Sequence, residues 1–569
     1  MCSLRTAATA GDDRSEYDFI VVGAGSAGCA LANRLSAEGS HRVLLLEAGG
    51  REYRRSLISI PVAWLAASNT PAFGWGLQTE PETAADGRVI PQPRGKLLGG
   101  TSSINGMMYS RGNPGDYDRW RDLGLPGWSY AEVLPYFKRM ERSWRGEGAY
   151  HGASGPLAVS RQPPDRFITP RMLQAAARLG YRQVTDFHGV ETEGFGLPDF
   201  TIRRGRREST AIAYLAPALD RRNLHLETGA HATRVLIENA RAIGVQYMQG
   251  KALRIARASR EVILAAGAFG SPQLLLLSGI GPPRELEAAG VEPRHALAGV
   301  GKNLQDHPLV VGIYRASGAC TFERHLRIDR LALALAAWRL FGAGPLAANP
   351  ISTQAFLRLG AKAAWPDVQF QVTHVSMLAR PWFPLWRAGA GHQFTAVALS
   401  LRPTGRGEVT LRSADPFAPP RIRLGLLVTE SDRRTAREML KLIRRFFATE
   451  PVAGLVSGEV APGTGAQSDA ELDAYIRATI QTGAHPTSTC AMGRGDAAVL
   501  DEQLRVRGIG ALRVADASSM PDVPSGNTNA PSIMIAEKAS DLILGKPPLP
   551  PERDAAAVVT PPGRVSAPS

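Results

Sequence analysis

Glycines near the N-terminus have the spacing of a dinucleotide-binding loop. The loop comprises Gly23, Gly25, Ser26, Ala27 and Gly28. Its glycines allow a tight turn and a close approach of the backbone to a pyrophosphate, which the N-terminus of the next helix then faces. Glu47 follows Gly28 by about 20 residues, where a carboxylate can accept hydrogen bonds from both ribose hydroxyls. An acid there disfavours a ribose phosphate, so the pattern predicts FAD or NAD. The alternative is that the glycines only form a sharp turn.

The segments around this loop are expected to form a βαβ unit. The apolar runs 17–22 and 42–47 predict strands, and residues 27–35 between them predict a helix. A second strand and helix, at 262–266 and 271–278, flank another glycine turn and are expected to face the same cofactor.

The central part of the chain has no nucleotide motif. The Gly- and Pro-rich stretch 49–115 predicts loops that wrap a ligand, and residues 120–142 predict a helix. Residues 310–480 contain strand-like runs such as 394–401 and a helix near 432–447. We expect the substrate-binding region there.

Composition excludes several classes of protein. The 569 residues are enough for more than one domain, and 44% hydrophobic with 21% charged residues is ordinary for a globular protein. The formal net charge is +14, but the arginines are scattered and no nucleic-acid-binding motif accompanies them, so we expect no nucleic-acid partner. Cys2, Cys29, Cys320 and Cys490 form no CxxC pair, so we expect neither a disulfide framework nor a metal site. We expect a cytoplasmic protein without a membrane-spanning segment.

Several longer strings resemble the signatures of one enzyme family. Residues 95–107 (GKLLGGTSSINGM) resemble the first signature of the glucose–methanol–choline oxidoreductases, and residues 267–281 resemble the second. Further similar strings are 301–307 (GKNLQDH), 485–493 (HPTSTCAMG), 512–516 (LRVAD) and 526–531 (GNTNAP). The resemblance covers residues 17–543, and within the family the chain is similar to bacterial choline and primary-alcohol dehydrogenases.

The resemblance implies an α/β, or composite α+β, fold. A Rossmann-type FAD-binding domain is expected to interleave with a substrate-binding domain built on an antiparallel sheet with helices. The FAD-binding domain would comprise residues 15–155, 215–310 and 481–545, and the substrate-binding domain 156–214 and 311–480. The proline- and alanine-rich residues 546–569 are expected to be a disordered tail.

The resemblance also implies which residues contact FAD. Small residues of the first signature can lie flat against the flavin ring without a clash. They are Gly99, Gly100, Thr101, Gly106 and Met107. Asn105 is expected at the edge of the isoalloxazine ring, with a turn-capping role as the alternative, and Asp516 with Ala517 near the phosphate and ribityl chain. Ile104 stands where some members carry a histidine that bonds covalently to FAD, so we predict non-covalent FAD.

Alcohol oxidation requires a base that takes the hydroxyl proton while a hydride leaves the carbon for the flavin. By resemblance His485 is that base, and an imidazole has a suitable pKa. Asn527 aligns best with the second catalytic position of the family, where an amide can hold the developing alkoxide. Asn529 is the alternative, and either asparagine can cap the helix expected near Pro531.

The sequence motifs say less about the substrate and the electron acceptor than about the cofactor. The apolar runs 331–341 and 377–386 have basic flanks, and three interpretations stay open: a lid or core segment, an apolar access channel, or a shallow contact with a membrane. We expect a dehydrogenase that converts a primary alcohol to the aldehyde with a quinone-like acceptor. Choline as substrate and oxygen as acceptor are alternatives. A non-redox lyase or a light-driven decarboxylase on the same scaffold is a more remote one.

Overall fold

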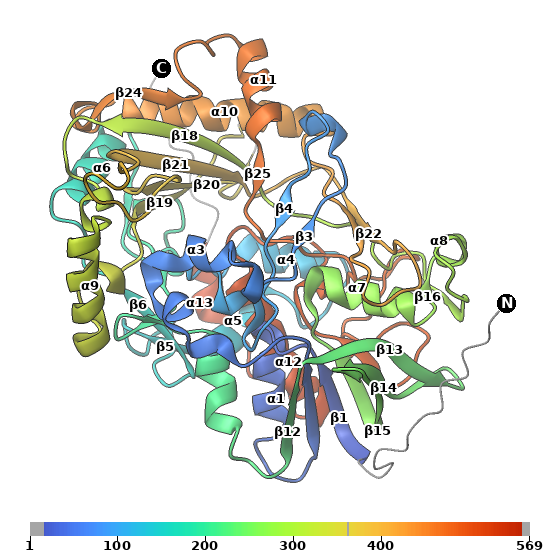
Figure 1. Ribbon diagram of the computed structural model, residues 1–569. Coiled ribbons are helices and arrows are strands. Elements are labelled where there is room, and N and C mark those ends of the chain that lie inside the picture. The colour runs from blue at the N-terminus through green and yellow to red at the C-terminus, as the bar shows by residue number, and fades with distance from the viewer. Residues whose placement is uncertain (1–15, 361–362, 560–569) are drawn as a thin grey trace.

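The computed structural model describes residues 16–360 and 363–559 of the chain. Two large β-sheets lie at opposite ends of the molecule, at the bottom and the top of the view in Figure 1. Each sheet has a hydrophobic core of its own. Within the described residues, no helix is both long and apolar enough to cross a lipid bilayer.

The first sheet combines parallel and antiparallel strands, and its parallel part is that of a dinucleotide-binding fold. Its strands, in spatial order, are β12 (Leu224–Thr228), β2 (Val43–Glu47), β1 (Glu16–Val22), β15 (Ala252–Leu264), β14 (Arg241–Gln249) and β13 (Ala230–Glu238), and β26 (Leu512–Val514) pairs with the end of β15. The pairs formed by β1, β2, β12 and β26 are parallel, whereas β13, β14 and β15 form an antiparallel meander. Every residue of β2 is buried, as expected of a parallel strand with both faces covered.

Helices cover this sheet. They are α1 (Ser26–Leu35), which packs on α12 (Asn529–Leu544), then α5 (Tyr130–Met140), which packs on α12, and α7 (Gly267–Leu277), which packs on β13. The single helix expected over 120–142 is wrong: α4 (Pro114–Asp122) and α5 are separate. Gly124 and Gly127 between them have φ of +89° and +88°, a left-handed conformation that interrupts a helix.

The second sheet is largely antiparallel. Its strands, in spatial order, are β24 (Val456–Ala461), β18 (Pro308–Ala316), β21 (Gln393–Ser400), β20 (Val368–Thr373), β19 (Ile351–Leu357), β8 (Gly194–Gly196) and β7 (Gln183–Val184), with β25 (Gln481–Thr482) paired to β18. One face carries α10 (Glu430–Phe447), with α11 (Asp469–Thr479) beside it, and α6 (Ile168–Arg178) packs on β19. Side chains such as Val310, Phe370 and Ala396 fill the core beneath α10.

Further helices and strands lie outside these two sheets. They are α2 (Ser56–Ser59), α3 (Trp64–Ser68), α8 (Pro283–Ala288), α9 (Ile328–Phe341), β3 (Leu77–Gln78), β4 (Pro91–Gln92), β5 (Glu141–Ser143), β6 (Leu157–Arg161), β9 (Asp199–Phe200), β10 (Ile202–Arg203), β11 (Arg206–Arg207), β16 (Ile280–Gly281), β17 (His295–Ala296), β22 (Glu408–Thr410) and β23 (Arg421–Arg423).

The C-terminal segment differs from its expected disorder. Residues 546–559 are ordered and include α13 (Arg553–Val558). Lys138 of α5 bonds Glu552 at 2.6 Å, and Leu549 packs against the core of the first sheet. The composition suggested a tail because proline and alanine are common there, but a few apolar side chains suffice to hold it on α5. Residues 560–569 lie outside the described residues, and the exact domain boundaries stay a prediction.

Candidate active site

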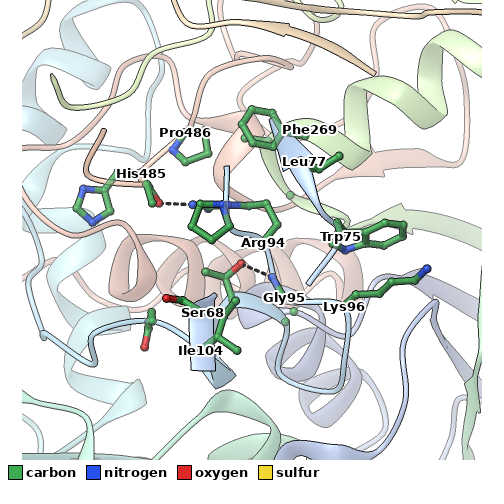
Figure 2. Close-up of a pocket in the computed structure, with 18 of the residues that line it drawn as sticks. Ser68, Trp75, Leu77, Arg94, Gly95, Lys96, Ile104, Phe269, His485 and Pro486 are labelled. Carbon is green, nitrogen blue, oxygen red and sulfur yellow. Dashed lines mark hydrogen bonds between the residues drawn. The ribbon is translucent and has the colours of Figure 1, made fainter. Parts of the chain in front are cut away.

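A cavity of about 1330 Å³ lies between the two sheets, and Figure 2 shows part of its wall. Most of the residues predicted to bind the cofactor line it: Gly23, Gly25, Ser26, Ala27, Glu47, Gly100, Thr101, Asn105, Gly106, Met107, Asp516 and Ala517. Gly28 and Gly99 lie behind the wall. The structure therefore brings together segments from both ends of the chain around one space.

The glycines leave room for a phosphate-bearing ligand. A Cβ on Gly28 would lie 1.8 Å from the carbonyl oxygen of Gly23, so Gly28 permits close packing of α1 on the loop. A Cβ on Gly100 would lie 2.8 Å from the Cα of Gly25, so the two glycine loops touch. A Cβ on Gly25, in contrast, would meet protein only at 3.9 Å and would occupy the cavity itself. The loop therefore fits the close approach of a pyrophosphate at the N-terminus of α1.

Glu47 ends β2 at the wall of the cavity. Its two carboxylate oxygens accept hydrogen bonds from the backbone N–H groups of Ala24 and Gly49, at 2.9 and 2.8 Å. Burial raises the pKa of this carboxyl to about 7. The backbone bonds fix its orientation, and its remaining lone pairs can accept hydrogen bonds from ribose hydroxyls.

Both carboxylate oxygens of Asp516 are bonded to protein groups in the cavity wall. One carboxylate oxygen accepts bonds from the N–H of Gly267 and the hydroxyl of Ser271, at 2.8 and 2.6 Å. The other accepts from the N–H and the hydroxyl of Ser518, at 2.7 and 2.6 Å. Asp516 thereby ties the start of α7 to its own loop and positions Ala517 at the cavity.

Asn105 has the turn-capping contact that was its alternative role, although it also lines the cavity. Its Oδ1 accepts from the N–H of Met107 at 3.1 Å and from Nη1 of Arg207 at 2.8 Å. Arg207 also donates to the carbonyl oxygens of Asn105 and Ile58, at 2.6 and 2.8 Å. Burial lowers the pKa of Arg207 to about 9. The sequence assigns Arg207 no role, because it stands among several neighbouring arginines and nothing in their spacing reveals its burial.

Ile104 lines the cavity with 1% of its surface exposed and packs in a cluster with Ile58 and Leu97. Its aliphatic side chain has no atom that could bond covalently to a flavin. The structure thus fits the prediction of a dissociable cofactor.

His485 and Asn527 meet at the cavity. Nδ2 of Asn527 lies 3.0 Å from Nε2 of His485, and both residues line the wall. Oδ1 of Asn527 accepts from Nε2 of Gln369 on β20 at 3.2 Å, which fixes the amide with its N–H group toward the imidazole. Asn529 instead accepts from the hydroxyl of Ser26 at 2.7 Å. Of the two asparagines left open by the sequence, Asn527 is the one that faces His485.

The opposite side of the His485 ring is held by residues that the sequence did not assign. Nδ1 of His307 lies 3.0 Å from Nδ1 of His485. Asp306 accepts from the backbone N–H of His485 at 2.8 Å. Arg94 donates to the carbonyl oxygen of Ala484 at 2.6 Å, and Figure 2 shows its guanidinium turned toward this loop. His307 belongs to the string 301–307, but that resemblance by itself gave the residue no role.

The surroundings keep His485 neutral. Burial, followed by His307 and Arg94, lowers the pKa of its imidazole well below the ordinary value of 6.5. Because the amide of Asn527 donates to Nε2, the ring proton lies on Nδ1 and points to His307. The lone pair on Nε2 accepts this bond at the cavity wall, and an alcohol that replaces the Asn527 amide there could give its hydroxyl proton to Nε2.

The second sheet supplies an apolar wall. Alternate residues of a strand point to opposite faces, so the residues next to those beneath α10 face the cavity. They form cross-strand rows: Leu309 with Leu399, Val311 with Val397 and Gln371, and Ile313 with Thr395 and Thr373. Among the described residues that line the cavity, the carboxylates are Glu47 and Asp516, and both lie on the side of the first sheet.

The chain is similar to known flavoenzymes along nearly its whole length. Sequence models of the GMC oxidoreductase family match residues 17–309 and 403–536. An oxygen-dependent choline dehydrogenase of Vibrio vulnificus is 41% identical over 544 residues, which cover 95% of this chain and 96% of that protein. A choline dehydrogenase of the same description from Brucella anthropi is 41% identical over 94% of this chain and 96% of that protein.

Solved structures of flavoenzymes are also similar to this chain along most of its length. Pyridoxine 4-oxidase from Mesorbium loti has 30% sequence identity and a TM-score of 0.82, covering 92% of this chain and 98% of that one. Formate oxidase from Aspergillus oryzae has 27% identity and a TM-score of 0.87, covering 94% and 99%. Together with the glycine loops and the cavity, these similarities establish that the chain belongs to the GMC family of FAD-dependent oxidoreductases, which act on CH–OH groups.

Proposed function

We propose that this enzyme oxidises an uncharged, largely apolar primary alcohol to the aldehyde. The observation that carries the proposal is the composition of the cavity wall on the second sheet. Leu309, Val311, Ile313, Val397 and Leu399 present aliphatic side chains there. A wall of this kind binds hydrocarbon through the hydrophobic effect but offers no charge to a cationic substrate.

Two side chains would act on the alcohol. The substrate hydroxyl would displace the 3.0 Å hydrogen bond between Nδ2 of Asn527 and Nε2 of His485, donating its hydrogen to Nε2 and accepting from Nδ2. His485 takes the proton as a neutral base, and the Asn527 amide holds the negative charge that develops on the oxygen. Nδ1 of His485 keeps its bond to His307 in both protonation states. FAD, when bound, supplies the acceptor for the hydride.

The residues that would hold FAD come from three parts of the wall. The loop Gly23–Gly28 would cradle the pyrophosphate, Glu47 the ribose, and the segment Gly100–Met107 the flavin ring. Asp516 and Ala517 would flank the phosphate and ribityl chain. The open Cβ direction at Gly25 and the backbone-oriented carboxylate of Glu47 support this assignment.

Choline is the second candidate, because relatives at 41% identity are named choline dehydrogenases. The rings of Trp64 and Tyr475 line the cavity and could stabilise a quaternary ammonium through cation–π contacts.

A matched pair of substrates separates the two candidates. Choline and its neutral carbon isostere, in which a carbon replaces the quaternary nitrogen, have the same shape and differ in charge. Anaerobic bleaching of the flavin and kcat/KM should favour the neutral alcohol by about tenfold or more, since the cation would lose its hydration without gaining a counter-charge. A preference for choline would contradict the proposal and identify the enzyme as a choline dehydrogenase.

We further propose a quinone-like electron acceptor in preference to oxygen. The wide aliphatic wall supports this choice, because a quinone ring and its apolar substituents need such a surface. After anaerobic reduction by an alcohol, admission of oxygen should reoxidise the flavin slowly, whereas a soluble quinone should do so rapidly. Reoxidation by oxygen at the rate of turnover would instead make the enzyme an oxidase.

A further inference from the structure

One region of the surface holds the most exposed large apolar side chains among the described residues. Leu333, Leu340, Phe341, Leu378 and Leu385 are each at least 72% exposed, and no other large apolar residue within 16–360 and 363–559 exceeds 59%. Folded proteins scatter single exposed apolar residues, but a cluster of this kind marks a surface that contacts an apolar partner.

The cluster belongs to two segments that are bonded to each other. The N–H of Ile328, at the start of α9, donates to the carbonyl oxygen of Trp382 at 3.0 Å, and the N–H of Trp382 donates to Leu326 at 3.1 Å. We call the exposed side of α9 together with residues 377–387 the α9 face. Helix α9 lies along one side of the molecule, as Figure 1 shows.

Helix α9 packs on the protein by its other side. Trp338 is 1% exposed, and its Nε1 donates to the carbonyl oxygen of Gly205 at 2.8 Å. Leu333 and Leu340 are separated by two helical turns, so they share the side that points away from the protein. The outward side of this helix is thus largely apolar, whereas the outward side of a surface helix is usually polar.

Positive charge accompanies these apolar residues. Exposed arginines flank them at positions 324, 330, 339, 380 and 387. The segments 324–341 and 377–387 contain a single acid, Asp329, and it is paired with Arg327 at 2.6 Å. A second copy of this chain is a poor occupant of such a surface, because a symmetric contact would bring the arginines of both copies together. Anionic lipid headgroups above an apolar bilayer match both properties.

The α9 face lies beside the active-site cavity. Met377 belongs to the face, is 45% exposed, and also lines the cavity. The buried side of α9 shares a cluster with Ile60, Val62 and Ala63, and the next residue, Trp64, lines the cavity as well.

We propose that the α9 face seats the holoenzyme on an anionic lipid bilayer, with the cavity at the membrane surface. The apolar side chains would enter the boundary between headgroups and acyl chains, and the arginines would contact lipid phosphates. An apolar alcohol or a quinone could then reach the cavity from the lipid. The inference does not depend on the identity of the substrate, since binding to lipid is measured without turnover.

Co-sedimentation with lipid vesicles tests the proposal. The holoenzyme should bind vesicles of phosphatidylcholine mixed with phosphatidylglycerol, bind phosphatidylcholine alone more weakly, and dissociate as salt rises. The double variant Leu340→Ser/Phe341→Ser should lower the affinity about tenfold or more, because it removes the apolar contact. The variant Arg380→Gln/Arg387→Gln should lower it about fivefold for each arginine, on mixed vesicles only.

Leu253→Ser/Ile255→Ser on β15 is the matched control, since these residues are 56% and 51% exposed but lie outside the α9 face. It should bind as the unchanged enzyme does, and bound FAD absorbance reports that each variant is folded. Equal binding by the Leu340/Phe341 variant and the control would overturn the proposal, as would no binding to either kind of vesicle. Self-association in light scattering, without vesicle binding and abolished by Leu340→Ser/Phe341→Ser, would also overturn it and identify a protein interface.

Discussion

At the scale of single residues, the proposed chemistry depends on the environment of one imidazole. His485 is buried between His307 and the cavity, and Asp306 and Arg94 bond the backbone of its loop. Burial and nearby positive charge both disfavour the imidazolium. The protein thus keeps the base unprotonated before substrate binds, and Asn527, which does not titrate, leaves that state undisturbed.

The pH profile follows from this shift. Because the pKa of His485 in the folded enzyme lies well below 6.5, the base stays neutral as pH falls through 6.5 and is lost only at clearly lower pH. We expect kcat/KM to be flat from neutral pH through 6.5 and to decrease only below it. Over the same acidic range the unfolded chain binds the proton first, so the folded state also loses stability. A decrease in kcat/KM centred near pH 6.5 would contradict the lowered pKa of His485.

The two asparagines should differ in what they do. Asn527→Ala should lower kcat by about 100- to 1000-fold with FAD still bound, because it removes the donor to the developing alkoxide. Asn529→Ala loses only the bond from Ser26 and should change kcat by less than about tenfold. Stopped-flow reduction of the flavin measures both. If Asn529→Ala were the slower variant, Asn527 would not be the second catalytic residue.

At the scale of elements, two loops from distant parts of the chain form one cradle. The Gly23–Gly28 loop leads from β1 into α1, and Gly100 contacts the backbone of Gly25 without a side chain between them. The N–H of Gly99 also donates to the carbonyl oxygen of Ala24 at 2.8 Å, so a hydrogen bond joins the two loops as well. The cradle therefore depends on the absence of a Cβ at this contact.

Gly100→Ala tests the contact. The new Cβ would lie 2.8 Å from the Cα of Gly25 and would also require φ near +50°, so the loops must separate and FAD should dissociate more than about tenfold more readily. Gly87→Ala is the control, because Gly87 has φ of +69° with no atom within 4 Å of its Cβ position. It should cost about 1 kcal/mol in stability and leave FAD binding unchanged. Equal FAD retention in the two variants would refute the role of the contact.

At the scale of the whole molecule, the cofactor cradle and the substrate wall belong to different sheets. The first sheet brings Glu47 and the glycine loops to the cavity, and the second brings Val311 and Val397. A ligand that contacts both sides stabilises the entire fold, because it binds the folded state alone.

Denaturing the whole protein tests whether FAD is bound covalently or non-covalently. Since Ile104 has no nucleophilic atom, acid precipitation should release the flavin into the supernatant, and a denaturing gel should show no fluorescent protein band. Added FAD should then raise the melting temperature of the apoprotein in proportion to the logarithm of its concentration. Fluorescence that stays with the denatured chain would show a covalent bond at some other residue.

Local sequence determined much of this protein. The glycine spacing at 23–28, the acid at Glu47 and the apolar runs of β1 and β2 predicted the nucleotide-binding unit, because turns, helix starts and buried parallel strands depend on neighbouring residues. The longer signatures predicted the family, the cofactor and His485. The single helix predicted over 120–142 was wrong because left-handed glycines interrupt it, and the disorder predicted for residues 546–559 was wrong because they pack on the protein.

Only the tertiary structure decided which of several residues has a given role where the neighbouring sequence favoured none of them. Asn527 and Asn529 lie two positions apart in one string, but the start of α12 turns the first toward His485 and the second toward Ser26. Arg207 is one of several neighbouring arginines, yet it alone among them is fully buried, against Asn105. The apolar run 377–386 gave no sign of whether it would be core, channel or surface, and the fold exposes it beside α9. Such outcomes depend on contacts between segments 42 to 503 residues apart in the chain, which the order of residues alone does not display.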